Sequence, residues 1–235
     1  MSLKRVLIAL FALSLIFTIC GCSEDDDPIS SGGLQAPAPP VIQNVECPVG
    51  MAASTNPYAT YAENYLLYLN AFTAFDSYIT PASNAVVTQV GDTVKAVWTS
   101  GTLEYDVRFV TDGGYNKWFV YLDGNDGPLV YSNQLYIEAR IDPSSNNDGY
   151  FMAHPNPSNF NEVLSWSWET VSGIYRITYT NSTANSYKVT RATDGSGIVE
   201  YLINSAASIV VTWVPDGNSG TWNNISGSQT GTWQL

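Results

Sequence analysis

The feature that most constrains this chain is a long region, from Ala85 to the C-terminus, in which apolar and polar residues alternate with a period of two. The alternation is clearest in residues 103–109, 164–168 and 175–180. Because successive side chains of a strand point to opposite faces of its sheet, each run predicts a strand with one buried and one wet face. Further candidate strands are residues 117–122, 134–141, 186–191, 198–203 and 208–214.

Turn motifs separate these runs, and five of them are Asp-Gly pairs that begin at Asp112, Asp123, Asp148, Asp194 and Asp216. Glycine supplies the positive φ that tight hairpin turns require. A spacing of about ten residues per strand and turn predicts roughly ten to twelve antiparallel strands in sequence order. Parallel pairing is disfavoured, since it needs long crossover connections and no segment after residue 79 has a helical period.

Residues 57–79 are the one strong helix candidate. Asn56 is suited to the N-cap, Pro57 to the first helical position, and Thr80-Pro81 to the end. Aromatic and aliphatic side chains recur at steps of three and four, which predicts a packing stripe along one side of the helix. The stripe consists of Tyr58, Tyr61, Tyr65, Tyr68, Phe72, Phe75 and Ile79, with alanines 59, 62, 71 and 74 around it.

A flat sheet of this many strands would expose an apolar face and two edges. We therefore expect a mainly β fold, an antiparallel meander that forms a barrel, a half-barrel or a strongly curved sheet, with the helix on one face or in one opening. The alternative is a two-sheet β-sandwich. A short repeat, Gly-Thr-Trp at residues 220–222 and again at 231–233, predicts two adjacent strands with matching tryptophans.

The N-terminus has the pattern of a signal peptide. Lys4-Arg5 precede an apolar stretch at residues 6–19, which is shorter than the roughly 20 residues that a membrane-spanning helix needs. The sequence Ile19-Cys20-Gly21-Cys22 that follows resembles the lipobox of bacterial lipoproteins. That resemblance implies cleavage before Cys22, diacylglycerol on its thiol and an acyl chain such as palmitate on the new amine, which together anchor the protein to a membrane.

These features divide the chain into a signal peptide (residues 1–21), an acidic and then Pro/Gly/Ser-rich tether (22–40), and a single β-rich domain (41–235). The outline of the domain is similar to that of lipocalins and of the half-barrels that carry lipoproteins or lipids across the periplasm. Ser23 follows the lipidated cysteine, and residues 24–27 are all acidic. We expect an outer-membrane anchor, on the periplasmic face or at the cell surface.

Charge excludes one class of partner. Cleavage removes Lys4 and Arg5, so seven of the nine basic residues remain against 21 acidic residues, a formal charge of −14. Phosphate backbones are bound by clustered lysines and arginines, which this composition does not supply. Nucleic acid is therefore not an expected partner.

The sequence shows no catalytic constellation. Besides Cys22, the mature chain keeps only Cys47, so no internal disulfide forms, and we interpret Cys47 as a small buried hydrophobe, with a Cys47–His154 nucleophile pair left open. A single histidine cannot build a conventional zinc site. The oxygen-rich loops at residues 123–127 and 146–149 do not have the spacing of a calcium loop. We therefore predict a protein that is not an enzyme and has no metal or cofactor beyond its covalent lipid.

Two functions remain open. The first is a non-catalytic binding module whose ligand is either apolar and lipid-like or a glycan. The second is a structural or interaction lipoprotein that docks on an envelope protein without a small-molecule ligand. We expect Trp166, Trp168 and Trp213 in the core, because they share strand faces with aliphatic residues. The candidate ligand-binding residues are Trp222, Trp233, Tyr61 and Tyr65.

Overall fold

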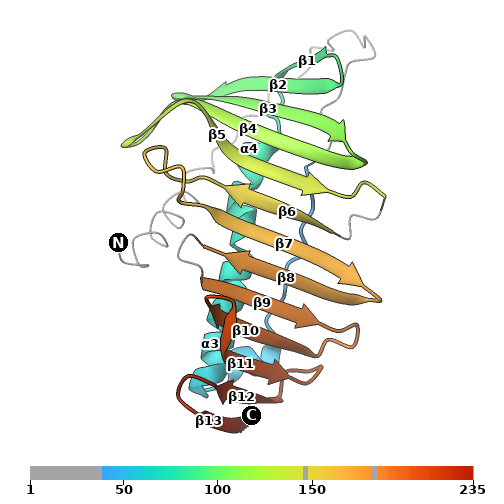
Figure 1. Ribbon diagram of the computed structural model, residues 1–235, viewed down its shortest axis with the longest axis vertical. Helices are drawn as coiled ribbons and strands as arrows, with labels where there is room; N and C mark the ends of the chain where they lie inside the picture. Colours follow the sequence, from blue (N-terminus) through green and yellow to red (C-terminus); the bar gives the residue numbers. More distant parts are fainter. Residues whose placement is uncertain (1–38, 145–147, 182–184, 235) are drawn as a thin grey trace, which may run out of the picture. The chain divides into compact units, whose positions relative to one another are not determined.

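The computed structural model describes residues 39–144, 148–181 and 185–234, all of which belong to one compact unit. The predicted signal peptide, Cys22 and the tether up to residue 38 lie outside the described residues. Within the described part, thirteen antiparallel strands form one sheet in sequence order, from β1 at one edge to β13 at the other (Figure 1).

The elements follow one another without interleaving. The helical segments are α2 (Val49–Ala53), α3 (Pro57–Leu69), the 3-10 helix η1 (Ala71–Phe75) and α4 (Asp76–Ile79). The strands are β1 (Val86–Val90), β2 (Thr93–Ser100), β3 (Leu103–Asp112), β4 (Tyr115–Asp126), β5 (Leu129–Ile141), β6 (Asp148–Ala153), β7 (Leu164–Val171), β8 (Ile174–Thr180), β9 (Asn185–Arg191), β10 (Gly197–Ile203), β11 (Ala206–Trp213), β12 (Ser219–Asn224) and β13 (Gln229–Gln234).

This architecture confirms the predicted antiparallel meander, with thirteen strands where roughly ten to twelve were expected, and excludes two of its forms. The sheet is open, because β1 and β13 are its two ends and do not pair with each other in the described part of the chain. Neither a closed barrel nor a two-sheet sandwich is formed. Seven of the eight named strand candidates fall entirely in strands, the eighth (208–214) runs one residue past the end of β11, and the two Gly-Thr-Trp copies lie in the adjacent strands β12 and β13.

Two of the five predicted Asp-Gly turns are wrong. Strand β4 continues through Gly124, which has φ 113° beside a register irregularity, and strand β6 contains Gly149. A Cβ at position 149 would lie 2.4 Å from the ring of Trp168 on the neighbouring strand. Gly149 therefore serves the close approach of an indole ring and not a turn.

Successive side chains of each strand point to opposite faces of the sheet. We call the face that packs against the helices the covered face and the other the open face. The centre of the covered face is a row in register on four adjacent strands, and its members are fully buried: Ile177, Val189, Val199 and Val211. Trp168 extends the row at one end and Trp222 at the other. The core is thus continuous from strand to strand, as the period of two predicts.

The helical segment 57–79 lies across the strands on the covered face, with α3 beside β8–β11 and α4 beside β4 (Figure 1). Asn56 caps α3 as predicted, since its Oδ1 accepts a hydrogen bond from the backbone N–H of Tyr58 at 2.9 Å. The segment is interrupted after Leu69 by η1. In a 3-10 turn side chains three apart face the same way, so both Phe72 and Phe75 reach the core.

The predicted packing stripe of α3 is displaced by one residue. The buried side chains of α3 are Ala59, Ala62, Leu66 and Leu69, whereas the tyrosines of the stripe lie beside this line and keep partial exposure. Alanine lets the helix approach the sheet closely, and a phenol hydroxyl that has no buried partner remains at the surface. The predicted packing face is therefore confirmed for Phe72, Phe75 and Ile79 and in part for Tyr58, Tyr65 and Tyr68, which are half-buried and pack against the edge of the core, whereas Tyr61 is exposed.

An extended segment before α2 completes the covered face on the other side of α3. The amide of Asn70 pairs with the backbone of Val45, accepting from its N–H and donating to its C=O at 2.9 Å each. The hydroxyl of Tyr175 donates to the carbonyl of Gln43 at 3.1 Å. None of the helices among the described residues has the length and apolar character needed to cross a membrane.

Candidate functional site

Two surfaces carry the candidate functional residues, one on each face of the sheet. The first, which we call the tyrosine surface, is a cluster of aromatic rings on one side of α3. Its members come from the helix and from strands β8, β9, β10 and β12, and they are Tyr58, Tyr61, Tyr65, Tyr68, Tyr179, Tyr187, Tyr201 and Trp222.

The rings of the tyrosine surface stack on one another. Tyr58 lies 3.8 Å from Trp222 between ring centroids at an interplanar angle of 10°. Tyr65 lies 4.8 Å from Tyr187 and 5.6 Å from Tyr201, and both pairs are within 30° of parallel. The rings of Tyr58 and Trp222 therefore cover one another, whereas Tyr61 meets Tyr58 edge-on and is 45% exposed.

Three phenols of this surface, those of Tyr65, Tyr179 and Tyr187, stay neutral. Burial, together with the neighbouring phenols, raises the pKa of Tyr65 to about 12, and burial with Tyr68 raises the pKa of Tyr179 to about 12. The pKa of Tyr187 is raised for the same reasons. Near neutral pH these groups are hydrogen-bond donors and acceptors without charge.

Three of the four predicted ligand-binding residues meet on the tyrosine surface: Tyr61, Tyr65 and Trp222. Trp233 does not, because it is only 3% exposed and packs over Gly220, its direct partner across β12 and β13. The repeat explains this burial, since each tryptophan of the β12–β13 hairpin lies opposite the glycine of the other copy. A ligand cannot reach the ring of Trp233.

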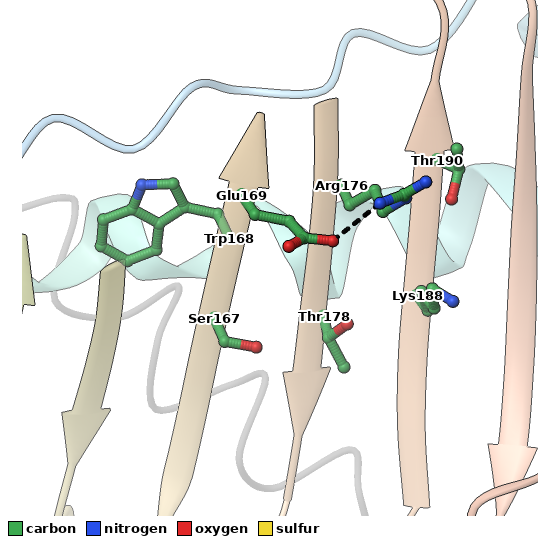
Figure 2. A pocket seen from close by; sticks show the side chains of 7 residues that line it. All are labelled: Ser167, Trp168, Glu169, Arg176, Thr178, Lys188 and Thr190. Carbon is green, nitrogen blue, oxygen red and sulfur yellow. Dashed lines mark hydrogen bonds and ion pairs between the residues drawn. The ribbon is translucent and has the colours of Figure 1, made fainter. Parts of the chain in front are cut away.

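The second surface is a hollow of about 450 Å³ on strands β7, β8 and β9, mostly lined from the open face (Figure 2). Six of its lining side chains project from the open face: Ser167, Glu169, Arg176, Thr178, Lys188 and Thr190. The seventh lining residue, Trp168, is 4% exposed and its indole packs over Gly149. Figure 2 shows this indole directed away from the other six side chains.

Strand register arranges the six side chains in two rows. Ser167, Thr178 and Lys188 are direct cross-strand partners in one row. Glu169, Arg176 and Thr190 are partners in the other, two residues further along each strand. Each of the three strands therefore contributes one short hydroxyl side chain and one long charged side chain, and this difference in length forms the hollow.

The hollow contains unused hydrogen-bonding groups. Within the described residues, the hydroxyls of Ser167, Thr178 and Thr190 make no hydrogen bond to the rest of the protein. Arg176 donates to Glu169 at 2.9 Å, and Lys188 lies 3.6 Å from a carboxylate oxygen of Glu200. The charges are thus paired, and the three hydroxyls are free to donate and to accept.

Sequence reasoning did not identify these residues as a site. It placed Ser165, Ser167, Arg176 and Thr178 on a wet face, which is correct, but it contained no information on cross-strand register. The polar residues of the 164–168 and 175–180 runs were a signal for the site, because they lie on the wet face of two candidate strands. The hydrophobic pattern decides which face each position takes, and the type and length of the connecting turns then decide which positions face one another.

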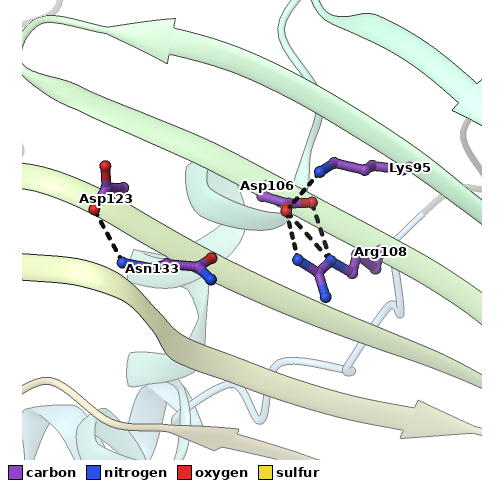
Figure 3. A network of polar contacts seen from close by, with 5 residues as sticks. All are labelled: Lys95, Asp106, Arg108, Asp123 and Asn133. Carbon is purple, nitrogen blue, oxygen red and sulfur yellow. Dashed lines mark hydrogen bonds and ion pairs between the residues drawn. The ribbon is translucent and has the colours of Figure 1, made fainter.

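A second polar cluster on the open face is structural. The carboxylate of Asp106 binds Arg108 at 2.7 Å and Lys95 at 2.9 Å (Figure 3). Burial opposes ionisation of Asp106, but the hydrogen bonds from Arg108 and Lys95 outweigh it and hold the pKa of this carboxyl below its usual range. The carboxylate side chain is 10% exposed and each cation 37%. The cluster is therefore a satisfied ion-pair network and not a vacant binding site.

Replacing Asp106 with asparagine is expected to lower the free energy of unfolding at pH 7 by about 1.5–3 kcal/mol, the range for hydrogen bonds to charged groups. Because the folded-state pKa is depressed, the contribution is present above the unfolded pKa of about 3.9 and is lost as the pH falls through the folded value. Denaturation at pH 7 and pH 2 checks this, since wild type and Asp106→Asn should converge at pH 2. The control is Asp112→Asn, which removes an exposed ion pair to Lys117 and should be nearly silent. A difference between wild type and Asp106→Asn that is unchanged at pH 2 would contradict this.

The Cys47–His154 pair is not supported by the contacts of either residue. His154 is 6% exposed, stacks on Phe160 at 4.0 Å between ring centroids and bonds the carbonyl of Phe160 through Nδ1. Cys47 is half-buried, and its nearest polar contact is the carbonyl of Pro48. Burial and the charge of Glu63 raise the pKa of the Cys47 thiol to about 11, so the nucleophilic thiolate is scarce at neutral pH.

No three His, Cys, Asp or Glu side chains of the described ranges lie close enough together to hold a metal ion. Comparison of the chain with known protein families, with curated proteins and with solved structures finds no match. Its function is therefore argued from its own surfaces.

Proposed function

We propose that this chain is an exported, lipid-anchored, non-catalytic binding protein of the cell envelope, and that it holds a glycan in the open-face hollow. The proposed export and lipid anchor rest on residues 1–22, with Cys22 as the lipidated residue. The proposed location is the outer membrane, on its periplasmic or outer side. The binding role rests on the hollow of about 450 Å³ with its three unpartnered hydroxyls.

The chemistry of the hollow suits a polyhydroxylated ligand. Serine and threonine hydroxyls both donate and accept, Glu169 accepts, and Arg176 and Lys188 donate, which matches the mixed donors and acceptors of a saccharide. The volume is within the range of about 300–1,000 Å³ for small-molecule sites. A lipid-like ligand has less support, because Leu66, Leu69, Phe72 and Phe75 already fill the covered face.

Removing the central hydroxyl of the hollow should weaken glycan binding. In the full chain, Thr178→Val keeps the shape of the side chain and removes one hydrogen-bonding group, so affinity should fall about two- to tenfold. The measurement is binding of the purified protein to an array of oligosaccharides, followed by calorimetric titration with the members that bind.

Thr230→Val is the matched control, since Thr230 lies on the same face in β13, is exposed and is remote from the hollow in strand order. Equal affinities of the two variants for the glycan would show that the glycan does not bind in the hollow. The absence of any saccharide binding would reject the glycan role.

The alternative is an envelope lipoprotein that binds a protein partner, and the tyrosine surface favours it. Neutral tyrosines are enriched in protein interfaces, where they offer rigid area and a polar tip. None of the ring and hydrogen-bond contacts of this surface among the described residues involves a charged side chain. Recovery of a stoichiometric protein partner from the native membrane, without any glycan, would favour this alternative.

A further inference from the structure

The basic residues of the described chain are gathered on one face of the sheet. Each of six follows or precedes a residue buried on the covered face, so the six side chains share the open face. They are Lys95, Arg108, Lys117, Arg140, Arg176 and Lys188; the seventh, Arg191, is paired with Tyr175 and Gly197 and projects from the covered face. A chain rich in acids thus places six of its seven described cations on the face that carries the hollow, and two of them, Arg176 and Lys188, line it.

Five of these six cations have a carboxylate partner. Asp106 binds two of them, and Asp112, Glu169 and Glu200 bind one each. Within the described ranges, Arg140 forms no ion pair. Glu138, the carboxylate two residues before it on the same face, accepts the hydroxyl of Tyr150 instead.

Two aromatic rings fix the orientation of the Arg140 guanidinium. Its Cζ lies 4.2 Å from the ring centroid of Tyr115 and 5.1 Å from that of Tyr150. Its Nε is buried and has no hydrogen-bond partner in the described part of the chain. Stacked rings stabilise the cation without using its N–H groups, so the two terminal Nη groups keep their capacity to bind an anion, while the buried Nε is out of its reach.

Strand register connects Arg140 to the hollow. Arg140 is the cross-strand partner of Tyr150, and Tyr150 is the partner of Ser167 at the rim of the hollow. At about 4.8 Å between neighbouring strands, Arg140 lies about 10 Å from Ser167 along one row. An extended ligand that lies across the strands can therefore occupy both places.

We propose that Arg140 is an anion subsite and that the glycan of the hollow is an acidic one, whose carboxylate, sulfate or phosphate group binds the guanidinium. This inference rests on the proposed function and names the class of its ligand. The planar guanidinium matches such anions in a two-point hydrogen bond.

The test compares acidic oligosaccharides with neutral counterparts of the same backbone. The probes are tetragalacturonate with its methyl ester for carboxylates, and sulfated and phosphorylated oligosaccharides with their unmodified forms. The full chain should bind at least one acidic probe about tenfold more tightly than its neutral counterpart, as expected for a hydrogen bond to a charged group. The pair that shows this preference identifies the anion.

Arg140→Gln should abolish the preference, so that the acidic and neutral members bind alike. Arg140→Lys keeps the charge without the fork and should retain only part of the preference. Arg191→Gln makes the same change of net charge on the covered face and should retain all of it. A thermal melt of each variant checks that the fold is kept.

The outcomes separate the two proposals. Neutral saccharides bound as well as acidic ones would overturn the anion subsite and leave the glycan role in place. A preference for the acidic probe that survives Arg140→Gln would also overturn the subsite. Absence of binding to every saccharide would overturn the proposed function and the subsite with it.

Discussion

Replacing Trp166 with alanine is expected to destabilise the domain by about 3–5 kcal/mol, the usual cost of removing a buried tryptophan ring. Trp166 is 1% exposed and lies where the helical segment meets the middle of the sheet. Its ring contacts Phe75, Phe151 and Tyr179 at 5.8, 5.6 and 5.0 Å between centroids. The truncation therefore opens a cavity between η1 and the sheet, and surrounding aromatic rings are too rigid to fill it.

A hydrogen bond adds to this cost. The indole Nε1 donates to the backbone carbonyl of Tyr68 at 3.3 Å, close to the end of α3, where carbonyls lose their helical partners. Equilibrium unfolding in guanidinium chloride, followed by circular dichroism, measures the loss. Trp222→Ala is the control, since Trp222 is only half-buried and stacks mainly on Tyr58. Similar losses for the two variants would show that Trp166 is not a centre of the core.

The face of the sheet to which each side chain points could be predicted from the sequence, because it depends only on the alternation within one strand. The alternation in 164–168 and 175–180 placed Trp166 and Ile177 inside and Ser167 and Thr178 outside, as observed. The openness of the sheet could not be predicted. It depends on whether the first and last strands meet, which is decided by twist accumulated over all the strands and by the helical segment that covers the apolar face.

The glycines of the Asp-Gly pairs were the main source of error in the prediction of local structure. In this chain a glycine serves either a turn or a close approach of a ring, and the sequence Asp-Gly does not distinguish the two. Gly113, Gly195 and Gly217 have positive φ in turns, whereas Gly149 lies under the indole of Trp168. The difference becomes visible only when the neighbouring strand is in register.

The candidate site was predictable only in part for the same reason. Tyr61, Tyr65 and Trp222 were recognised as available aromatic residues, and the structure brings them onto one surface. The hollow was missed because Ser167, Thr178 and Lys188 become neighbours through register, over a sequence separation that no motif spans. Arg140 was missed because the sequence does not show which side chains bind its neighbours. Glu138, the nearby carboxylate, accepts a hydrogen bond from Tyr150.

The second large effect is expected at Gly197, where substitution by alanine should cost about 1–3 kcal/mol through overpacking. A Cβ at this position would lie 2.2 Å from the ring of Trp213, its direct partner on β11. The ring cannot move away freely, because its Nε1 donates to the carbonyl of Gly195 at 3.0 Å. Four tryptophans of the sheet, at positions 168, 213, 222 and 233, lie opposite a glycine in this way. Gly197→Ala therefore tests a packing device that this fold uses repeatedly.

A double-mutant cycle separates this clash from a general effect of alanine in the strand. Trp213→Leu removes the ring and is destabilising by itself, but it also removes the atoms that the new methyl group would meet. The double variant should be at least about 1 kcal/mol more stable than the sum of the two single losses predicts, which is the signature of residues in direct contact. Additive losses in denaturant unfolding would mean that the indole does not occupy the space above Gly197.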